Sequence, residues 1–172
     1  MELNYQKTAQ LNTDIISFKQ DIGIMSLLLI PSKKVLNWIA NIIKRILFNK
    51  LNKVSKLLKE NQDIFPNEYY DWLEINDMIQ YSLKRDASLI TQEDFNFVND
   101  IHNSFFELIL YKLNLLKDND YELNESFQDN FNMKYSEFNN NLIKFKEYFY
   151  SNIYQESFDA QEVIDYLNVA WE

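Results

Sequence analysis

The scarcity of turn-forming residues constrains the fold of this chain more than any other feature. The 172-residue sequence contains one glycine, Gly23, and two prolines, Pro31 and Pro66. Tight β-hairpins need glycine at left-handed positions, so this chain has few means of making them. Apolar residues instead recur at spacings of three and four, which indicates amphipathic helices. We therefore predict one all-α domain over residues 1–172, a bundle of five or six helices.

Proline, glycine and capping residues mark where the predicted helices begin, end and weaken. Pro31 ends the first helix, because proline disfavours helical angles in the residue before it. Gly23 lies inside that helix and indicates a kink or a close backbone approach. The second helix starts near Ser32, and Pro66 suits the first turn of the third. The residues Thr91 to Asp94 resemble a capping box that opens the fourth helix.

Each predicted helix carries an apolar stripe that we expect to face the core. The polar run 117–126 separates the fourth helix from the fifth, and a short sixth helix is expected after Ser157. The stripes consist of Leu11, Ile15, Phe18, Ile22, Met25 and Leu29; of Val35, Ile39, Ile42, Ile46, Val54, Leu57 and Leu58; of Trp72, Ile75, Ile79 and Leu83; of Val98, Ile101, Phe105, Ile109 and Leu116; and of Phe131, Tyr135, Phe138, Leu142, Phe145 and Phe149.

The charges are divided unevenly along the chain. The net charge is −9, yet residues 22–59 contain eight lysines and arginines and no acidic residue, which gives that segment +8. Residues 60–172 contain 23 acidic and seven basic residues and so carry −16. Such a division indicates either a charged partner or pairing between helices inside the molecule.

Composition excludes several classes of protein. The chain has no cysteine, so a disulfide framework, a thiolate nucleophile and a cysteine zinc site are excluded. The apolar run 22–30 is shorter than the roughly 20 residues that span a bilayer. The first ten residues lack the pattern of a secretory signal, so we expect a cytoplasmic protein. Abundant Asn, Lys, Ile, Phe and Tyr indicate an AT-rich bacterial or mobile-element gene.

The sequence offers little chemistry. One glycine cannot form a glycine-rich phosphate loop. The only histidine, His102, lies on the apolar side of its predicted helix, which favours a core or boundary role over a catalytic base. No glutamate stands three residues before it, as a di-iron motif requires. We expect no catalytic residue, no metal ligand and no cofactor, although paired carboxylates leave a small all-α enzyme as an alternative.

Our first functional hypothesis is a non-enzymatic inhibitor or immunity protein of the anti-defence type. Its acidic helical surface would cover a basic site on another protein by steric and electrostatic occlusion. Nucleic acid is disfavoured, because −16 over residues 60–172 repels a polyanion. The expected contact surface lies on the third helix, opposite Trp72, where tyrosines alternate with carboxylates. It comprises Tyr70, Asp71, Glu74, Asp77, Met78 and Tyr81.

The alternative is a peripheral protein that binds an anionic membrane through the basic amphipathic helix 33–59. This segment contains Trp38 and follows an apolar run, as interfacial helices often do. Each lysine or arginine near anionic lipid contributes about 1 kcal/mol of attraction. The basic surface comprises Lys33, Lys34, Lys44, Arg45, Lys56 and Lys59. A third possibility is that these cations only balance the acidic helices around them.

Overall fold

The chain forms an antiparallel helical bundle in the residues that the computed structural model describes, 2–29 and 37–154. Within these ranges it contains five packed helices and no strand, which confirms the all-α prediction. The long helices are α1 Glu2–Leu28, α2 Asn37–Glu60, α3 Glu68–Lys84, α4 Gln92–Asp118 and α5 Glu125–Tyr148. A short 3₁₀ turn, η1 Ala87–Leu89, precedes α4, and a π-helical turn, η2 Phe149–Ile153, follows α5.

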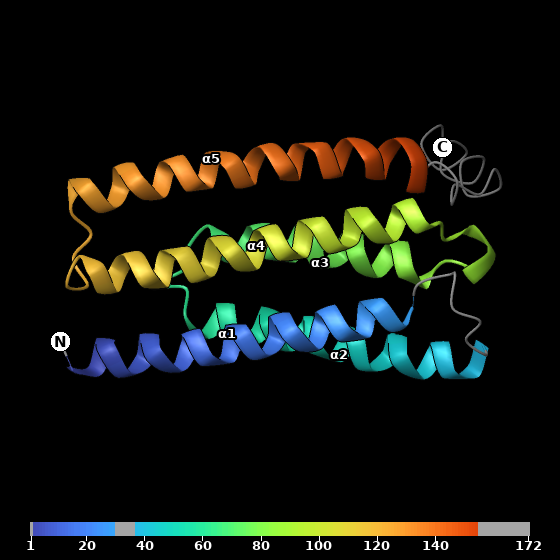
Figure 1. Ribbon diagram of the computed structural model, residues 1–172, viewed down its shortest axis with the longest axis horizontal. Coiled ribbons are helices and arrows are strands. Elements are labelled where there is room, and N and C mark those ends of the chain that lie inside the picture. Colours follow the sequence, from blue (N-terminus) through green and yellow to red (C-terminus); the bar gives the residue numbers. More distant parts are fainter. Residues whose placement is uncertain (1, 30–36, 155–172) are drawn as a thin grey trace, which may run out of the picture.

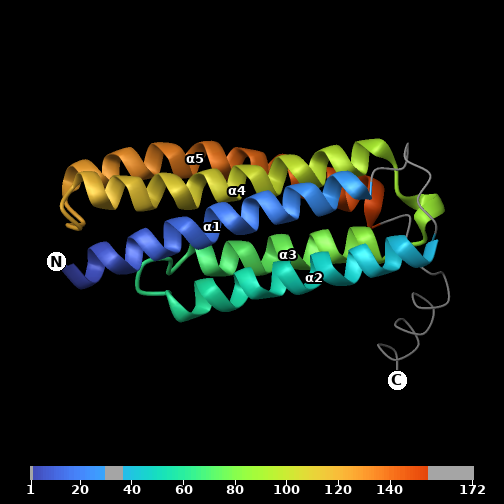
Figure 2. The same cartoon turned by 60° about the horizontal axis from the view of Figure 1, so that its bottom comes forward.

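The helices stack in three layers. Figure 1 shows α5 in one outer layer, α3 with α4 in the middle, and α1 with α2 in the other outer layer. Successive helices run in opposite directions, and Figure 2 shows α1 lying between α4 and the α2–α3 pair. Contacts between α1 and α2, α2 and α3, α3 and α4, and α1 and α4 close a four-helix ring. The fifth helix packs against the outside of this ring, mainly on α4.

The core is aromatic and centres on the middle layer. Trp72 is fully buried, and its ring centroid lies 5.0 Å from that of Phe105 and 5.5 Å from that of Phe106. Its indole nitrogen donates to the Ser55 hydroxyl at 3.0 Å, so the large ring is buried without an unsatisfied donor. Phe138 of α5 meets Phe105 from the other side at 5.9 Å. Aromatic contacts therefore connect α3, α4 and α5.

Most predicted stripes face the core. Those of the third and fourth helices are buried throughout, and in the first and fifth the remaining members, Phe18, Met25, Phe131 and Tyr135, are partly buried against the core. Thr91 and Asp94 form the predicted capping box, with each side chain accepting from the other's backbone amide. Gly23 does not mark a close approach, because a Cβ built there meets nothing within 4 Å. Val35 and the expected helix after Ser157 lie outside the described residues.

The predicted orientation of the second helix is wrong in its first half. Ile42 and Ile46 were expected to face the core, yet they are 46% and 39% exposed. Leu47 and Leu51 are buried instead, in line with Val54 and Leu58 further along the helix. Apolar residues cover more than half of the circumference of α2 in its first half, with the polar side formed by Asn41, Lys44 and Arg45. Its sequence therefore fits more than one stripe, and packing against α1 and α3 selects the one through Leu47.

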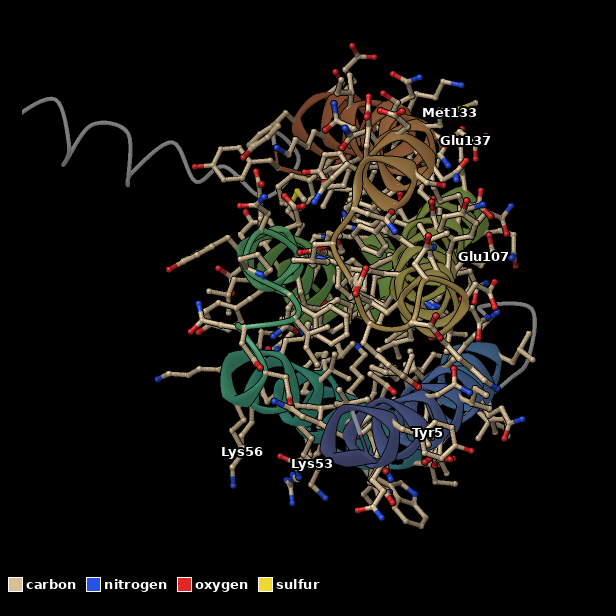
Figure 3. The ribbon with its side chains drawn as sticks, turned by 90° about the vertical axis from the view of Figure 1, so that its left-hand side faces the viewer. Tyr5, Lys53, Lys56, Glu107, Met133 and Glu137 are labelled. Carbon is tan, nitrogen blue, oxygen red and sulfur yellow. The ribbon has the colours of Figure 1, made fainter. Side chains whose placement is uncertain are left out.

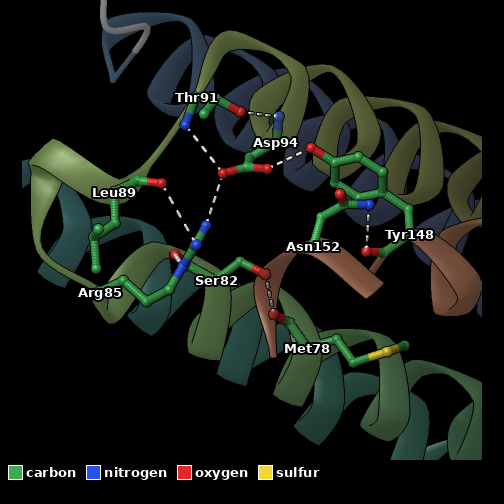
Figure 4. Close-up of polar contacts among 8 residues, drawn as sticks. All are labelled: Met78, Ser82, Arg85, Leu89, Thr91, Asp94, Tyr148 and Asn152. Atoms are coloured by element: carbon green, nitrogen blue, oxygen red, sulfur yellow. Dashed lines mark hydrogen bonds and ion pairs between the residues drawn. The ribbon is translucent and has the colours of Figure 1, made fainter. Parts of the chain in front are cut away.

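A buried polar network joins the ends of three helices at the turn between α3 and α4. Asp94 forms an ion pair with Arg85 at 2.8 Å and accepts from the Thr91 amide and the Tyr148 hydroxyl (Figure 4). Burial raises the pKa of Asp94, but the three hydrogen bonds and the Arg85 charge outweigh burial, so its pKa lies below the usual value. Arg85 also donates to the Ser82 carbonyl. The network holds the carboxyl end of α5 against the start of α4.

We predict that two neighbouring residues of α2 differ sharply in their contribution to stability. Leu47→Ala should lower the free energy of unfolding by about 2–5 kcal/mol, because it leaves a cavity in the core. The matched control Ile46→Ala should lower it by about 1 kcal/mol or less, since its side chain faces solvent. Urea denaturation followed by circular dichroism measures both. Equal losses, or a larger loss for Ile46→Ala, would contradict the observed orientation of α2.

Candidate functional site

Only some of the residues that the sequence predicts as a contact surface on the third helix are exposed in the structure. Tyr70 is 62% exposed and Asp77 is also exposed, as that hypothesis needs. Met78, however, is buried, so its predicted outward position is wrong. Tyr81 is half-buried, with its ring against Phe149 at 5.6 Å between centroids. The η2 turn therefore covers part of the predicted surface.

Two of the carboxylates predicted for that surface are bonded to side chains of the fifth helix. The Tyr135 hydroxyl donates to Asp71 Oδ2 at 2.8 Å, and Lys146 forms an ion pair with Glu74 at 2.7 Å. Burial is the main reason that the pKa of Asp71 is raised above its usual value, while the bond from Tyr135 opposes that rise. The six predicted residues thus form part of the α3–α5 contact and part of the exterior, rather than one exposed surface.

The predicted basic surface is largely exposed where the structure describes it. Arg45, Lys56 and Lys59 face solvent. Lys44 is half-buried near Asp86, and burial lowers its pKa more than that carboxylate raises it. The remaining two members, Lys33 and Lys34, lie outside the described residues.

An exposed apolar stripe accompanies these basic residues on α2. Trp38 is 63% exposed, and Ile42 and Ile46 follow it at four-residue intervals on the same side of the helix. Lys53 and Lys56 continue that side toward the carboxyl end, and Figure 3 shows both extending away from the bundle. The outer side of α2 is thus apolar in its first half and basic in its second.

The adjacent part of α1 extends the apolar area. Asp21 forms an ion pair with Lys50 at 3.1 Å, which fixes how the two antiparallel helices are aligned. That alignment puts Ile24 and Leu28 of α1 at the same level along the bundle as Ile46 and Ile42 of α2, and both α1 side chains are exposed. Ile24 also lines a groove with Asn99 and His102 of α4. We call the surface formed by Ile24, Leu28, Trp38, Ile42, Ile46, Arg45, Lys53 and Lys56 the α1/α2 face.

Acidic side chains gather on the other side of the molecule. Figure 3 shows Glu107 and Glu137 on α4 and α5, away from Lys53 and Lys56. The exposed carboxylates of these two helices are those of Glu93, Asp100, Glu107, Asp118, Glu125, Asp129, Glu137 and Glu147. The division of charge along the sequence therefore becomes a division across the layers of the bundle.

His102 is buried on the core side of α4, as its position in the sequence predicts, and its Nδ1 has no hydrogen-bond partner among the described residues. It is 1% exposed, its Nε2 lies 3.1 Å from Asn99 Oδ1, and its ring contacts Phe106 edge-on. Burial, with a smaller contribution from Lys19, lowers its pKa to about 4. Among the described residues no group of three or more His, Cys, Asp or Glu is placed to hold a metal ion.

Comparison with protein-family models, with curated proteins and with solved structures finds no match to this chain. Within residues 2–29 and 37–154, no helix has the length and apolar character needed to cross a membrane. Among the described residues, the α1/α2 face combines exposed apolar side chains with several exposed cations.

We predict that His102 makes the protein less stable as the pH falls. The folded protein keeps the imidazole neutral down to about pH 4, whereas the unfolded chain binds a proton near pH 6.5. Stability should therefore fall by about 2 kcal/mol between pH 7 and pH 5 from this group alone. Urea denaturation across that range should show a flatter profile for His102→Gln. Parallel profiles for the two proteins would contradict the buried, neutral assignment.

Proposed function

We propose that this protein is a non-enzymatic docking protein whose α1/α2 face binds an anionic membrane surface. The observation that carries the proposal is the exposure of Trp38, Ile42 and Ile46 on the same side of α2 as Lys53 and Lys56. Large apolar side chains that cluster on a protein surface mark contact sites for proteins or membranes. The cations beside them favour a negatively charged partner.

The arrangement suits a helix that lies flat in the lipid interface. Apolar side chains enter the boundary between headgroups and acyl chains, and tryptophan is favoured there because its ring is amphipathic. The exposed members Arg45, Lys53 and Lys56 would each contribute about 1 kcal/mol near anionic lipid. Because α1 and α2 together form one outer layer, their shared face can meet a flat surface without unfolding the bundle.

The separation of charge across the layers supports the same orientation. The carboxylates of α5 lie two layers from α1 and α2, roughly 16–20 Å at ordinary helix spacing. The Debye length at physiological ionic strength is about 8 Å, so salt screens the repulsion between α5 and the membrane. The net charge of −9 therefore does not prevent the basic layer from approaching anionic lipid.

We predict salt-sensitive binding to vesicles of phosphatidylcholine and phosphatidylserine. Lys53→Glu combined with Lys56→Glu should weaken binding by more than tenfold, because two attractions of about 1 kcal/mol each become repulsions. Trp38→Gln should also weaken vesicle binding, because it removes a large apolar side chain that would enter the lipid interface. Co-sedimentation at low and physiological salt measures these effects.

The matched controls for this experiment lie on α4 and α5. Lys117→Glu with Lys144→Glu makes the same change of charge at exposed sites on α4 and α5. Met133→Gln removes an apolar side chain that is 72% exposed on α5. Both should bind like the unaltered chain. Failure of the unaltered protein to bind anionic vesicles at low salt would refute the proposal.

A second proposal keeps the inhibitor hypothesis and moves its contact surface. The exposed carboxylates of α4 and α5, together with Asp77 and Tyr70, would face a basic site on a partner protein. The gathering of these carboxylates on α4 and α5, on a side of the molecule away from Lys53 and Lys56, favours it. This second proposal receives less support than membrane docking. Two of the predicted contact residues, Met78 and Tyr81, pack within the bundle, and two more, Asp71 and Glu74, are bonded to side chains of α5.

The second proposal predicts a protein partner whose binding is lost when charges on α5 are reversed. Capture from an extract of the native host should recover one basic protein at low salt and lose it as salt rises. Glu125→Lys with Asp129→Lys should abolish capture, whereas Lys53→Glu should leave it unchanged. Capture that depends on the α1/α2 face instead would assign the partner to that surface and refute this proposal.

A further inference from the structure

A pocket of about 420 Å³ lies at the end of the bundle where α3 begins, α4 ends and α5 begins. This is the opposite end from Trp38 and the apolar part of the α1/α2 face. Its wall is mixed. Apolar surface comes from Ile64, Leu116, Leu123, Phe127 and Phe131, and polar side chains such as those of Thr8, Asp63, Asn67, Gln128 and Asn132 line the rest. The volume falls within the range of about 300–1,000 Å³ that small-molecule sites occupy.

A buried ion pair stands in this pocket. Lys112 of α4 bonds to Glu68 Oε1 of α3, and both side chains are more than nine-tenths buried. The ammonium also lies 4.7 Å from the centre of the Phe131 ring, which contributes a cation–π attraction. Because each charge neutralises the other, the pair offers directed hydrogen-bonding atoms with little net charge.

Two polar atoms at this pocket are buried without a hydrogen-bond partner among the described residues. They are Oε2 of Glu68 and the hydroxyl of Tyr121, and both residues line the pocket. Leaving a buried polar group unpaired costs about 1–3 kcal/mol, and more for a charged group. Such groups are rare in folded proteins and call for an explanation such as a ligand.

The backbone of the α4–α5 loop holds Tyr121 in place. The Tyr121 amide donates to the Leu116 carbonyl at 2.7 Å and the Asp120 amide to the Lys117 carbonyl at 3.2 Å, which is the Schellman pattern at a helix end. That pattern needs one left-handed residue, supplied by Asp120 with φ of 53°. Tyr121 is also left-handed, with φ of 61°, which is uncommon for a bulky side chain. The loop therefore accepts strain at the residue whose hydroxyl is unpaired.

The side chains that line the pocket limit the chemical class of ligand that it can bind. Ionised Glu68 only accepts hydrogen bonds, so its partner must bring an N–H or O–H. A cationic donor is disfavoured, because Lys112 already neutralises the carboxylate and would repel a second cation. Phe127 and Phe131 lie nearly parallel, 5.9 Å apart between centroids, beside Leu116 and Leu123. Such walls favour a flat apolar body.

We propose that this pocket binds a neutral, flat heteroaromatic molecule that donates an N–H to Glu68 and meets the Tyr121 hydroxyl with a second polar group. The ring would lie among the apolar side chains of α4, the loop and α5. Ordered water alone is a poor occupant of the side formed by Leu116, Leu123, Phe127 and Phe131, because a water needs two to four polar partners and these side chains offer none. This inference is independent of membrane docking, since no residue of the α1/α2 face lines the pocket.

Indole and benzimidazole serve as the probes, with N-methylindole as the matched analogue that lacks the donor. Indole should cause saturable chemical-shift changes at Tyr121, Phe127 and Phe131. N-methylindole should bind at least tenfold more weakly, because it leaves the Glu68 oxygen unpaired. Protein-observed nuclear magnetic resonance on the full chain measures both dissociation constants.

Two variants separate pocket binding from adsorption elsewhere. Leu123→Trp places a larger side chain at the mouth, where Leu123 is 63% exposed, and should abolish saturable binding while the protein stays folded. Tyr121→Phe removes only the hydroxyl and should weaken benzimidazole, which carries a second ring nitrogen, more than indole. Tyr150→Phe, in the η2 turn beyond the far end of α5, is the matched control and should change the affinity for neither probe.

Three results would overturn the assignment. They are the absence of saturable binding by either probe, equal affinity for indole and N-methylindole, and binding that survives Leu123→Trp. An absence of saturable binding would mean that the pocket holds only water. Either of the other two results would mean that the probe binds at another site.

Discussion

The fold depends on the burial of α4 on several sides at once. This helix contacts α1, α3 and α5, and its aromatic residues Phe105 and Phe106 meet Trp72 of α3. A helix shared in this way belongs both to the four-helix ring and to the contact with the added fifth helix. Its polar groups are then placed by the same packing, which puts Lys112 against Glu68 at one end and Asp94 against Arg85 at the other.

Local sequence patterns predicted the helices well and their surroundings less well. The predicted stripes of α3 and α4 are buried throughout, because their apolar residues recur regularly at spacings of three and four. Burial extends beyond those stripes, to Phe106 and Leu108 of α4 for example, because α4 packs against several neighbours. In α2 the apolar residues between Trp38 and Leu51 form a side too broad to be buried whole, and only neighbouring helices decide that Leu47 is buried while Ile46 is exposed. Met78 was misplaced for a related reason, because η2 and α5 cover a side of α3 that the spacing assigned to solvent.

The pocket could not have been predicted from the sequence at all. Glu68 and Lys112 are 44 residues apart, and no motif connects them. Glu68 resembles an ordinary acidic residue in the first turn of a helix, where the helix dipole favours it. Only the tertiary arrangement shows that this carboxylate is buried and has one unpaired oxygen. The charge division was visible in the sequence, but its placement on separate layers required the fold.

The antiparallel order of the five long helices within residues 2–154 that the structure describes has a mechanical consequence. Residue 2 and residue 154 lie at opposite ends of the bundle, along helices as long as about 40 Å. A force applied between those residues acts parallel to the helix axes, so the contacts between helices are sheared together rather than peeled apart one by one. If the protein were pulled through attachments at these two points, the contacts of the whole aromatic core would therefore resist the force together.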